Sequence, residues 1–223
     1  MQQHSSQSGF SLIEMIVSLA LFSVVVTIAV GALLALIATN RQLQAEQSVM
    51  TNLSFALDSM TREIRTGTSY FCDAQNNYNA ARKIFRDGVN GTPATDVDSE
   101  LGDETDDCVD GRNGRKIHGI AFKESGDSIT SAAGEDRILY FFDEDENKIY
   151  RRVGAGQAQS IVSSGIYIND AEFYVTGSAP QHGSGATDDD QALVTIFIEA
   201  SETDDLDKVY TIQTTITQRT LDI

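Results

Sequence analysis

Glu14 is the side chain whose chemistry most needs an explanation, because it is a carboxylate within an apolar run. Residues 15–38 carry no charge, and most of them are Leu, Ile, Val, Ala or Phe. A carboxylate in hydrocarbon is costly, so such a group usually has a partner and a function. We therefore expect Glu14 to pair with a cation. The alternative is an incidental Glu whose carboxylate snorkels to the lipid headgroups.

The sequence Gly-Phe-Ser-Leu-Ile-Glu at residues 9–14 resembles the class III signal of type IV prepilins and pseudopilins. In that family a membrane aspartyl peptidase cuts after the glycine on the cytoplasmic side and then methylates the new N-terminal residue. The resemblance implies that Gly9 ends the leader, that Phe10 becomes N-methyl-phenylalanine, and that Glu14 is the family's fifth-position glutamate. Glu14 of an incoming subunit would then pair with the Phe10 amine of its filament neighbour.

The apolar run is long enough to cross a bilayer, for which about 20 residues suffice. A removable secretory signal would have a basic start and a shorter apolar stretch. The leader contains no Lys or Arg and Arg41 follows the run, so charge alone slightly favours the opposite orientation. The resemblance places the N-terminus in the cytoplasm. We expect a single-pass inner-membrane protein whose head is periplasmic or extracellular and which then enters a filament.

Residues 39–65 contain no Pro or Gly and repeat their apolar side chains at helical spacing. The expected apolar stripe consists of Leu43, Val49 or Met50, Leu53, Ala56 or Leu57, Met60 and Ile64. Gly67 is the expected stop signal. One helix from Phe10 to about Thr66 would be roughly 85 Å long. Arg62 and Arg65 are explained as cations that complement the helix dipole, and they receive no further role.

Beyond Gly67 the apolar period changes from 3.6 to 2, which indicates strands. Residues 137–142 and 148–153 form an expected hairpin around the acidic turn 143–147. Further strands are expected at residues 166–175, 192–200 and 208–218, with a weaker candidate at 117–122. The expected fold class is α+β and pilin-like, a long N-terminal helix packed on an antiparallel sheet. The expected divisions are a leader (1–9), a transmembrane or filament-core half-helix (10–38), an amphipathic half-helix (39–67) and a β-rich head (68–223).

Two further segments, residues 52–65 and 210–221, resemble the J-type minor pseudopilins, and the first also resembles the W-type. That resemblance implies a minor structural subunit of a type II secretion or type IV pilus filament that helps to initiate or cap assembly. The implied partners are the prepilin peptidase, other minor and major pilins or pseudopilins, and an inner-membrane assembly platform with its motor ATPase. One alternative is a type IV pilus minor pilin with an adhesive or DNA-uptake role. Another is a single-pass membrane-anchored binding module.

Cys72 and Cys108 both follow the apolar segment. If that segment exports the rest of the chain, the pair lies in an oxidising compartment, where a disulfide is the default expectation. Two buried free thiols are the alternative. A zinc site is disfavoured, because two cysteines without a nearby His fall short of four ligands.

Acidic residues crowd the segment 96–110, and hard oxygen ligands at alternate positions suit calcium. The candidate ligands are Asp96, Asp98, Glu100 and Asp107. The strict loop pattern fails, because position six is Leu101 and position twelve is Asp107. A solvated acidic loop is the favoured interpretation, with calcium as the alternative, and no other cofactor is expected. The acidic turn 143–147 and residues 188–190 are interpreted in the same way.

The composition disfavours two classes of function. The chain has 16 Lys plus Arg against 33 Asp plus Glu, a net charge of -17, so a nucleic-acid backbone would be repelled. Of the three histidines, His4 lies in the leader, and neither His118 nor His182 lies in a nucleophile motif. No glycine-rich phosphate loop or metal-spaced cluster occurs. We therefore expect no enzyme.

Overall fold

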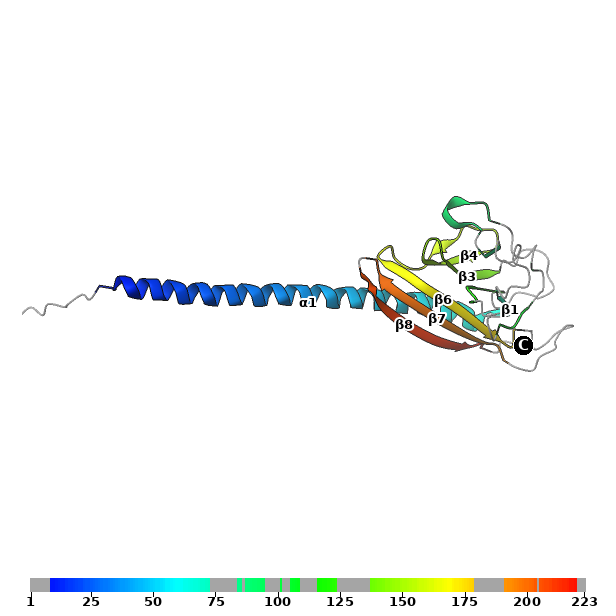
Figure 1. The fold of residues 1–223 in the computed structure, drawn as a ribbon. Helices are drawn as coiled ribbons and strands as arrows, with labels where there is room; N and C mark the ends of the chain where they lie inside the picture. The colour runs from blue at the N-terminus through cyan, green and yellow to red at the C-terminus, as the bar shows by residue number, and fades with distance from the viewer. Residues whose placement is uncertain are drawn as a thin grey trace, which may run out of the picture. The chain divides into compact units, whose positions relative to one another are not determined.

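A long helix and a set of antiparallel strands make up the regular structure of the chain, which was obtained as a computed structural model (Figure 1). The structure describes residues 9–72, 84–85, 87–94, 101, 105–108, 116–123, 137–178, 191–203 and 205–219. The chain forms two compact units, Met1–Gln47 and Ser48–Ile223, called here the N-terminal unit and the C-terminal unit. The fold class is α+β, as the sequence predicts.

Helix α1 spans Leu12–Thr66 and is 55 residues long. Within the N-terminal unit it is long and apolar enough to cross a membrane, and its most apolar stretch is entirely exposed. Two hydroxyl groups of this unit are satisfied by the helix itself. Those of Thr27 and Thr39 donate to the carbonyl oxygens of Ser23 and Ala35, at 2.8 and 3.0 Å. Neither hydroxyl would therefore enter lipid without an acceptor.

The part of α1 in the C-terminal unit buries one apolar stripe. Its buried members are Val49, Leu53, Ala56, Leu57, Met60 and Ile64. This stripe confirms the predicted period except at Leu43, which is 49% exposed. Of the alternatives Val49 and Met50, Val49 is the buried one, and Ala56 and Leu57 are both buried. The helix ends at Thr66, as predicted.

Five strands form the first sheet, in the order β1-β2-β3-β4-β5, and every neighbouring pair is antiparallel. Their bounds are Thr68–Cys72 (β1), Gly119–Lys123 (β2), Ile138–Asp143 (β3), Lys148–Val153 (β4) and Gln159–Ser160 (β5). The predicted hairpin of β3 and β4 is confirmed, with Asp143 opposite Lys148. The weaker candidate at 117–122 corresponds to β2. Strands β1 and β5 were not predicted.

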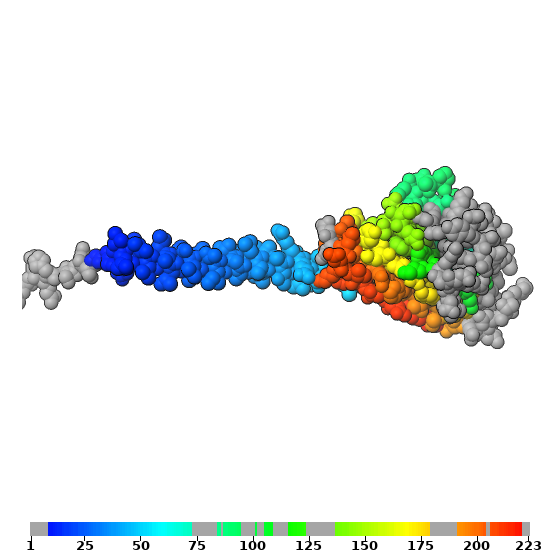
Figure 2. Space-filling model, in the orientation of Figure 1, coloured from blue at the N-terminus to red at the C-terminus, as the bar shows by residue number. Residues whose placement is uncertain are grey.

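Three strands form a second sheet, in the order β6-β7-β8, again antiparallel (Figure 1). Their bounds are Ile166–Thr176 (β6), Leu193–Glu202 (β7) and Asp205–Thr217 (β8). All three were predicted, but as members of one sheet with the other strands. β8 is an edge strand, and Figure 2 shows its residues in orange to red on the surface of the C-terminal unit.

The main core lies where α1 and both sheets meet, and β3 contributes to it through alternate residues. Ile138, Tyr140 and Phe142 join this main core, whereas Leu139 and Phe141 join a smaller core on the other face of β3. Because residues of a strand alternate between faces, β3 is covered on both sides, which explains its continuous apolar run. A short 3-10 helix, η1 (Val89–Gly91), lies beside this smaller core. The smaller core also includes Ile84, Phe85, Val89, Leu101, Ala121 and Tyr150.

Glu63 joins α1 to the β3–β4 hairpin through two polar contacts. Its Oε2 accepts hydrogen bonds from the hydroxyl of Tyr140 at 2.7 Å and from Nε of Arg151 at 2.9 Å. Burial, followed by the hydrogen bond to Glu63, raises the pKa of Tyr140, so this hydroxyl stays a donor. The helix is therefore oriented on the sheet by a charged acceptor as well as by its apolar stripe.

Gly67 is needed for packing rather than for a left-handed turn. A Cβ at this position would lie 2.4 Å from Cδ2 of Phe122, a buried ring of the main core. Gly67 is not among the glycines with positive φ. The helix end is closed instead by the hydroxyl of Tyr70, which lies 2.6 and 2.7 Å from the carbonyl oxygens of Ile64 and Gly67.

We predict that Glu63→Ala lowers the free energy of unfolding by roughly 2 kcal/mol, because it leaves the Tyr140 hydroxyl and the Arg151 guanidinium without their shared acceptor. The melting temperature of the full chain in detergent should fall by about 5 °C. Arg62→Ala is the matched control, since it removes an exposed charge from the same helical turn. Equal melting temperatures for the two variants would contradict the proposed role of Glu63.

Candidate functional site

The residues predicted to be processed lie immediately before α1. Gly9, Phe10 and Ser11 are not helical, and Leu12 begins the helix. Phe10 is 80% exposed, and no described atom outside its chain neighbours lies within 4 Å of the position that a Cβ of Gly9 would take. The Gly9–Phe10 peptide bond is therefore accessible within the described part of the isolated chain. Cleavage there, and methylation of Phe10, stay predictions.

Ser11 caps the start of α1. Its Oγ accepts a hydrogen bond from the backbone N–H of Glu14 at 3.4 Å, and its carbonyl oxygen accepts from the N–H of Met15 at 3.3 Å. Ser-x-x-Glu is the spacing of a capping box. This role of Ser11 was not predicted, although the spacing was available in the sequence as a signal. Glu14 lies in the first turn, where the helix dipole favours a negative charge.

The predicted disulfide between Cys72 and Cys108 is present, with the two Cα atoms 6.4 Å apart. Cys72 ends β1 in the first sheet, and Cys108 forms an isolated antiparallel bridge with Val175 of β6 in the second sheet. The covalent bond therefore ties the two sheets together. In the chain-entropy description, closing a loop of this size stabilises the fold by about 4 kcal/mol.

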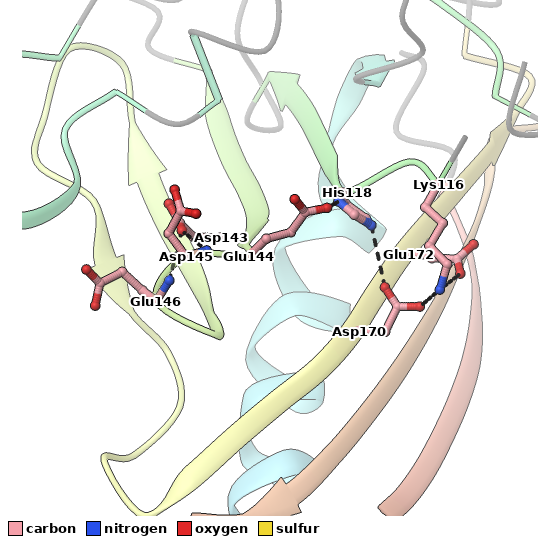
Figure 3. Close-up of polar contacts among 8 residues, drawn as sticks. All are labelled: Lys116, His118, Asp143, Glu144, Asp145, Glu146, Asp170 and Glu172. Atoms are coloured by element: carbon pink, nitrogen blue, oxygen red, sulfur yellow. Dashed lines mark hydrogen bonds and ion pairs between the residues drawn. The ribbon is translucent and has the colours of Figure 1, made fainter. Parts of the chain in front are cut away.

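A polar cluster lies between the two sheets (Figure 3). Nζ of Lys116 forms ion pairs with Asp170 and, at 3.3 Å, with Glu172 of β6. Nδ1 of His118 lies 3.1 Å from Oε1 of Glu144 in the β3–β4 turn, and its Nε2 lies 3.5 Å from Oδ1 of Asp170. These contacts join the segment before β2 to both sheets. None of these contacts was predicted. His118 was considered only as a candidate catalytic residue and Glu144 only as part of an acidic turn, and Lys116, Asp170 and Glu172 were not singled out.

Burial and neighbouring charges shift the pKa values of His118 and Lys116 in opposite directions. Burial lowers the pKa of His118 and outweighs the nearby carboxylates of Glu144, Asp170 and Glu172, which raise it. The hydrogen bond to Asp170 raises the pKa of Lys116. At neutral pH the cluster therefore contains a neutral imidazole and a cationic ammonium group. A neutral imidazole has one N–H, and Nε2 of His118 is buried without a hydrogen-bond partner among the described residues. The ion pairs of Lys116 and the contact between His118 and Glu144 still join β6 to the β3–β4 turn, so the arrangement suits a structural tie.

The structure describes only part of the acidic segment for which calcium binding was the alternative interpretation. Asp96, Asp98 and Glu100 lie outside the described residues, as do His4, His182 and residues 188–190. Oδ1 of Asp107 accepts a hydrogen bond from the N–H of Ser178 at 2.7 Å. Among the described residues, no group of three or more His, Cys, Asp or Glu side chains is arranged to hold a metal ion. The favoured solvated loop and the calcium alternative are both left untested by the described residues.

The acidic turn between β3 and β4 is organised by one of its own carboxylates. Oδ1 of Asp143 accepts hydrogen bonds from the N–H groups of Asp145 and Glu146, at 2.9 and 3.1 Å (Figure 3). An Asp that bonds to the backbone two residues later is a common device for closing a turn. These contacts agree with the expected hairpin turn.

Comparison with known families gives one match. Residues 4–30 match the family described as "Prokaryotic N-terminal methylation motif". The matched segment includes Gly9, Phe10 and Glu14 and the first part of α1, so it supports a type IV pilin-like signal. No curated protein and no solved structure matches the chain significantly. The motif and the N-terminal apolar helix, which is the one helix among the described residues that could cross a membrane, together suggest a single-pass membrane anchor.

We predict that the fold loses stability as the pH falls below about 6.5, in part through His118. Burial lowers the pKa of His118 in the folded state, so the unfolded chain binds more protons in this range. The contribution is complete above the unfolded pKa and is lost as the pH falls through the folded pKa. The urea midpoints of the wild type and of His118→Gln, measured at pH 7.5 and 5.5, should show a smaller drop for the variant. An equal or larger drop would show that His118 does not contribute.

Proposed function

We propose that the chain is a minor structural subunit of a type II secretion pseudopilus or of a type IV pilus. In this proposal it is cut after Gly9, N-methylated on Phe10, and helps to initiate or cap the filament. The observation that carries the proposal is the match of residues 4–30 to the methylation motif. The fold is consistent with it, because the motif lies at the start of an apolar helix and a disulfide-linked β-rich unit follows.

The first turn of α1 gives Glu14 a physical role in this proposal. Cleavage would leave the Phe10 amine beside the N-terminus of the helix, where the dipole disfavours a cation. A carboxylate in the first turn offsets that penalty. In a filament, Glu14 of an incoming subunit would pair with the Phe10 amine of its neighbour and set the axial position. A charge in an apolar filament core is tolerated when it has such a partner.

The partners follow from the same proposal. They are the prepilin peptidase, other minor and major subunits, and an inner-membrane assembly platform. The N-terminus would face the cytoplasm, where the peptidase cuts, and the C-terminal unit would lie on the other side. An oxidising compartment on that side suits the Cys72–Cys108 disulfide. No catalytic role is assigned to the C-terminal unit.

We expect the mature chain to begin with N-methyl-phenylalanine at position 10 when it is produced together with a prepilin peptidase. Intact-mass and N-terminal peptide mass spectrometry would measure this directly. The same chain produced without the peptidase is the control and should keep residues 1–9. An unprocessed Met1 in the presence of a peptidase that cuts a known prepilin would overturn the proposed function.

We expect Glu14→Ala to be processed normally but to enter filaments at least about tenfold less than the wild type, because the neighbouring amine loses its partner. The ratio of filament-associated to membrane-associated protein measures this effect. Glu14→Gln keeps the size of the side chain and removes its charge, so it should behave like Glu14→Ala. Normal incorporation of either variant would show that the carboxylate is not required.

A further inference from the structure

Three arginines converge on an open pocket at the C-terminal end of α1. The pocket has a volume of about 260 Å³ and is lined by Asp58, Thr61, Arg62, Arg65, Thr66 and Arg219. We call it the arginine pocket. All of its lining residues belong to the C-terminal unit. From the sequence, Arg62 and Arg65 were assigned to the helix dipole, and Arg219 was given no role.

Backbone pairing explains why Arg219 lies beside the helix. The N–H of Arg219 donates to the carbonyl oxygen of Arg65 at 2.8 Å, and Nε2 of Gln218 donates to the carbonyl oxygen of Gly67 at 2.9 Å. Gln218 and Arg219, which follow β8, are thereby held against the last turn of α1. These bonds bring Arg65 and Arg219, which are far apart in the sequence, to the same pocket.

The guanidinium groups are not needed to cap the helix, because other groups already bond to its last carbonyl oxygens. The hydroxyl of Thr66 donates to the carbonyl oxygens of Arg62 and Glu63, at 3.3 and 3.1 Å. The N–H of Gly67 donates to the carbonyl oxygen of Ile64 at 3.1 Å. The guanidinium groups of these arginines are therefore available to bind a ligand, even if their charges also complement the helix dipole as the sequence suggested.

The three arginines also differ from the other cations of their unit. Among the described Lys and Arg residues of the C-terminal unit, every other side chain has a polar, ionic or aromatic partner. Arg62, Arg65 and Arg219 are exposed, and their side chains form no hydrogen bond or ion pair with any residue that the structure describes. Asp58 lines the same pocket one turn before Arg62, yet no ion pair within 4.0 Å joins these two described residues.

We propose that the arginine pocket binds carboxylate side chains of an acidic segment on a second protein. Guanidinium groups match carboxylates geometrically and are enriched in protein interfaces. The volume is below the roughly 300–1,000 Å³ of small-molecule sites, so it suits one or two side chains. Asp58 and the two threonines add acceptors and hydroxyl groups, which suit a peptide that also presents N–H donors. They suit a bare phosphate less well. Such binding does not depend on cleavage or methylation of the N-terminus.

The test uses the full chain in a zwitterionic detergent and a fluorescein-labelled hexapeptide of alternating Asp and Glu as the probe. Fluorescence anisotropy should show saturable binding that weakens as salt is added. Arg62→Ala, Arg65→Ala and Arg219→Ala should each weaken binding by about fivefold. Arg41→Ala, which removes an exposed arginine outside the pocket, is the matched control and should bind like the wild type.

Two further variants separate the pocket from general attraction. Arg65→Lys keeps the charge but loses the fork that holds a carboxylate in two places, so it should weaken binding to an intermediate extent. Asp58→Asn removes the negative charge from the lining and should strengthen binding. A gain of binding cannot result from misfolding. If Asp58→Asn leaves binding unchanged or weaker, or if Arg41→Ala costs as much as the pocket variants, the proposal is wrong.

Other occupants give other outcomes in the same series. Inorganic phosphate that displaces the peptide at equal concentration would identify a phosphate site and overturn the proposal. So would binding to vesicles containing phosphatidylglycerol without binding of the peptide. Sedimentation of the chain alone would reveal self-association. If self-association occurs and is lost in Arg219→Ala, the occupant is a second copy, and the proposed second protein is overturned.

Discussion

An apolar helix surface must be covered, and this constraint acts on two parts of α1 in different ways. In the N-terminal unit the most apolar stretch is entirely exposed, so its cover has to come from outside the chain. In the C-terminal unit the chain supplies the cover itself, because two sheets bury the stripe from Val49 to Ile64. The exposed stretch needs a membrane or other helices, and the methylation motif at its start is consistent with both.

The same constraint explains how polar groups are treated along the helix. Ser11 satisfies the start of α1, the hydroxyls of Thr27 and Thr39 bond within it, and Tyr70 bonds at its end. Each of these groups is satisfied inside the chain. Glu14 differs, because a carboxylate in an apolar environment needs a cation, and none of the described residues supplies one to it. A partner from outside is the simplest way to complete it.

Periodicity predicted much of this fold because the pattern of buried side chains is local. The end of α1, the β3–β4 hairpin and the strands of the second sheet follow from alternation or helical spacing. The division into two sheets does not, because it depends on which strands pair over long distances. Long-range contacts limited the prediction of the functional residues in the same way. Residues 9–14 were identified by their order and the Cys72–Cys108 pair by its compartment, whereas the contacts of Lys116 and His118 depend on the approach of β6 and the β3–β4 turn.

Arginine serves two purposes in this chain, and burial separates them. Arg137 and Arg152 are almost fully buried and donate to backbone carbonyl oxygens, so they hold segments of the C-terminal unit together. Moving a charge out of water is costly, and those bonds offset the cost. Arg62 and Arg219 remain in water and have no such cost to offset. Their convergence at one pocket has no evident stabilising role, and this is why we assign the pocket to binding.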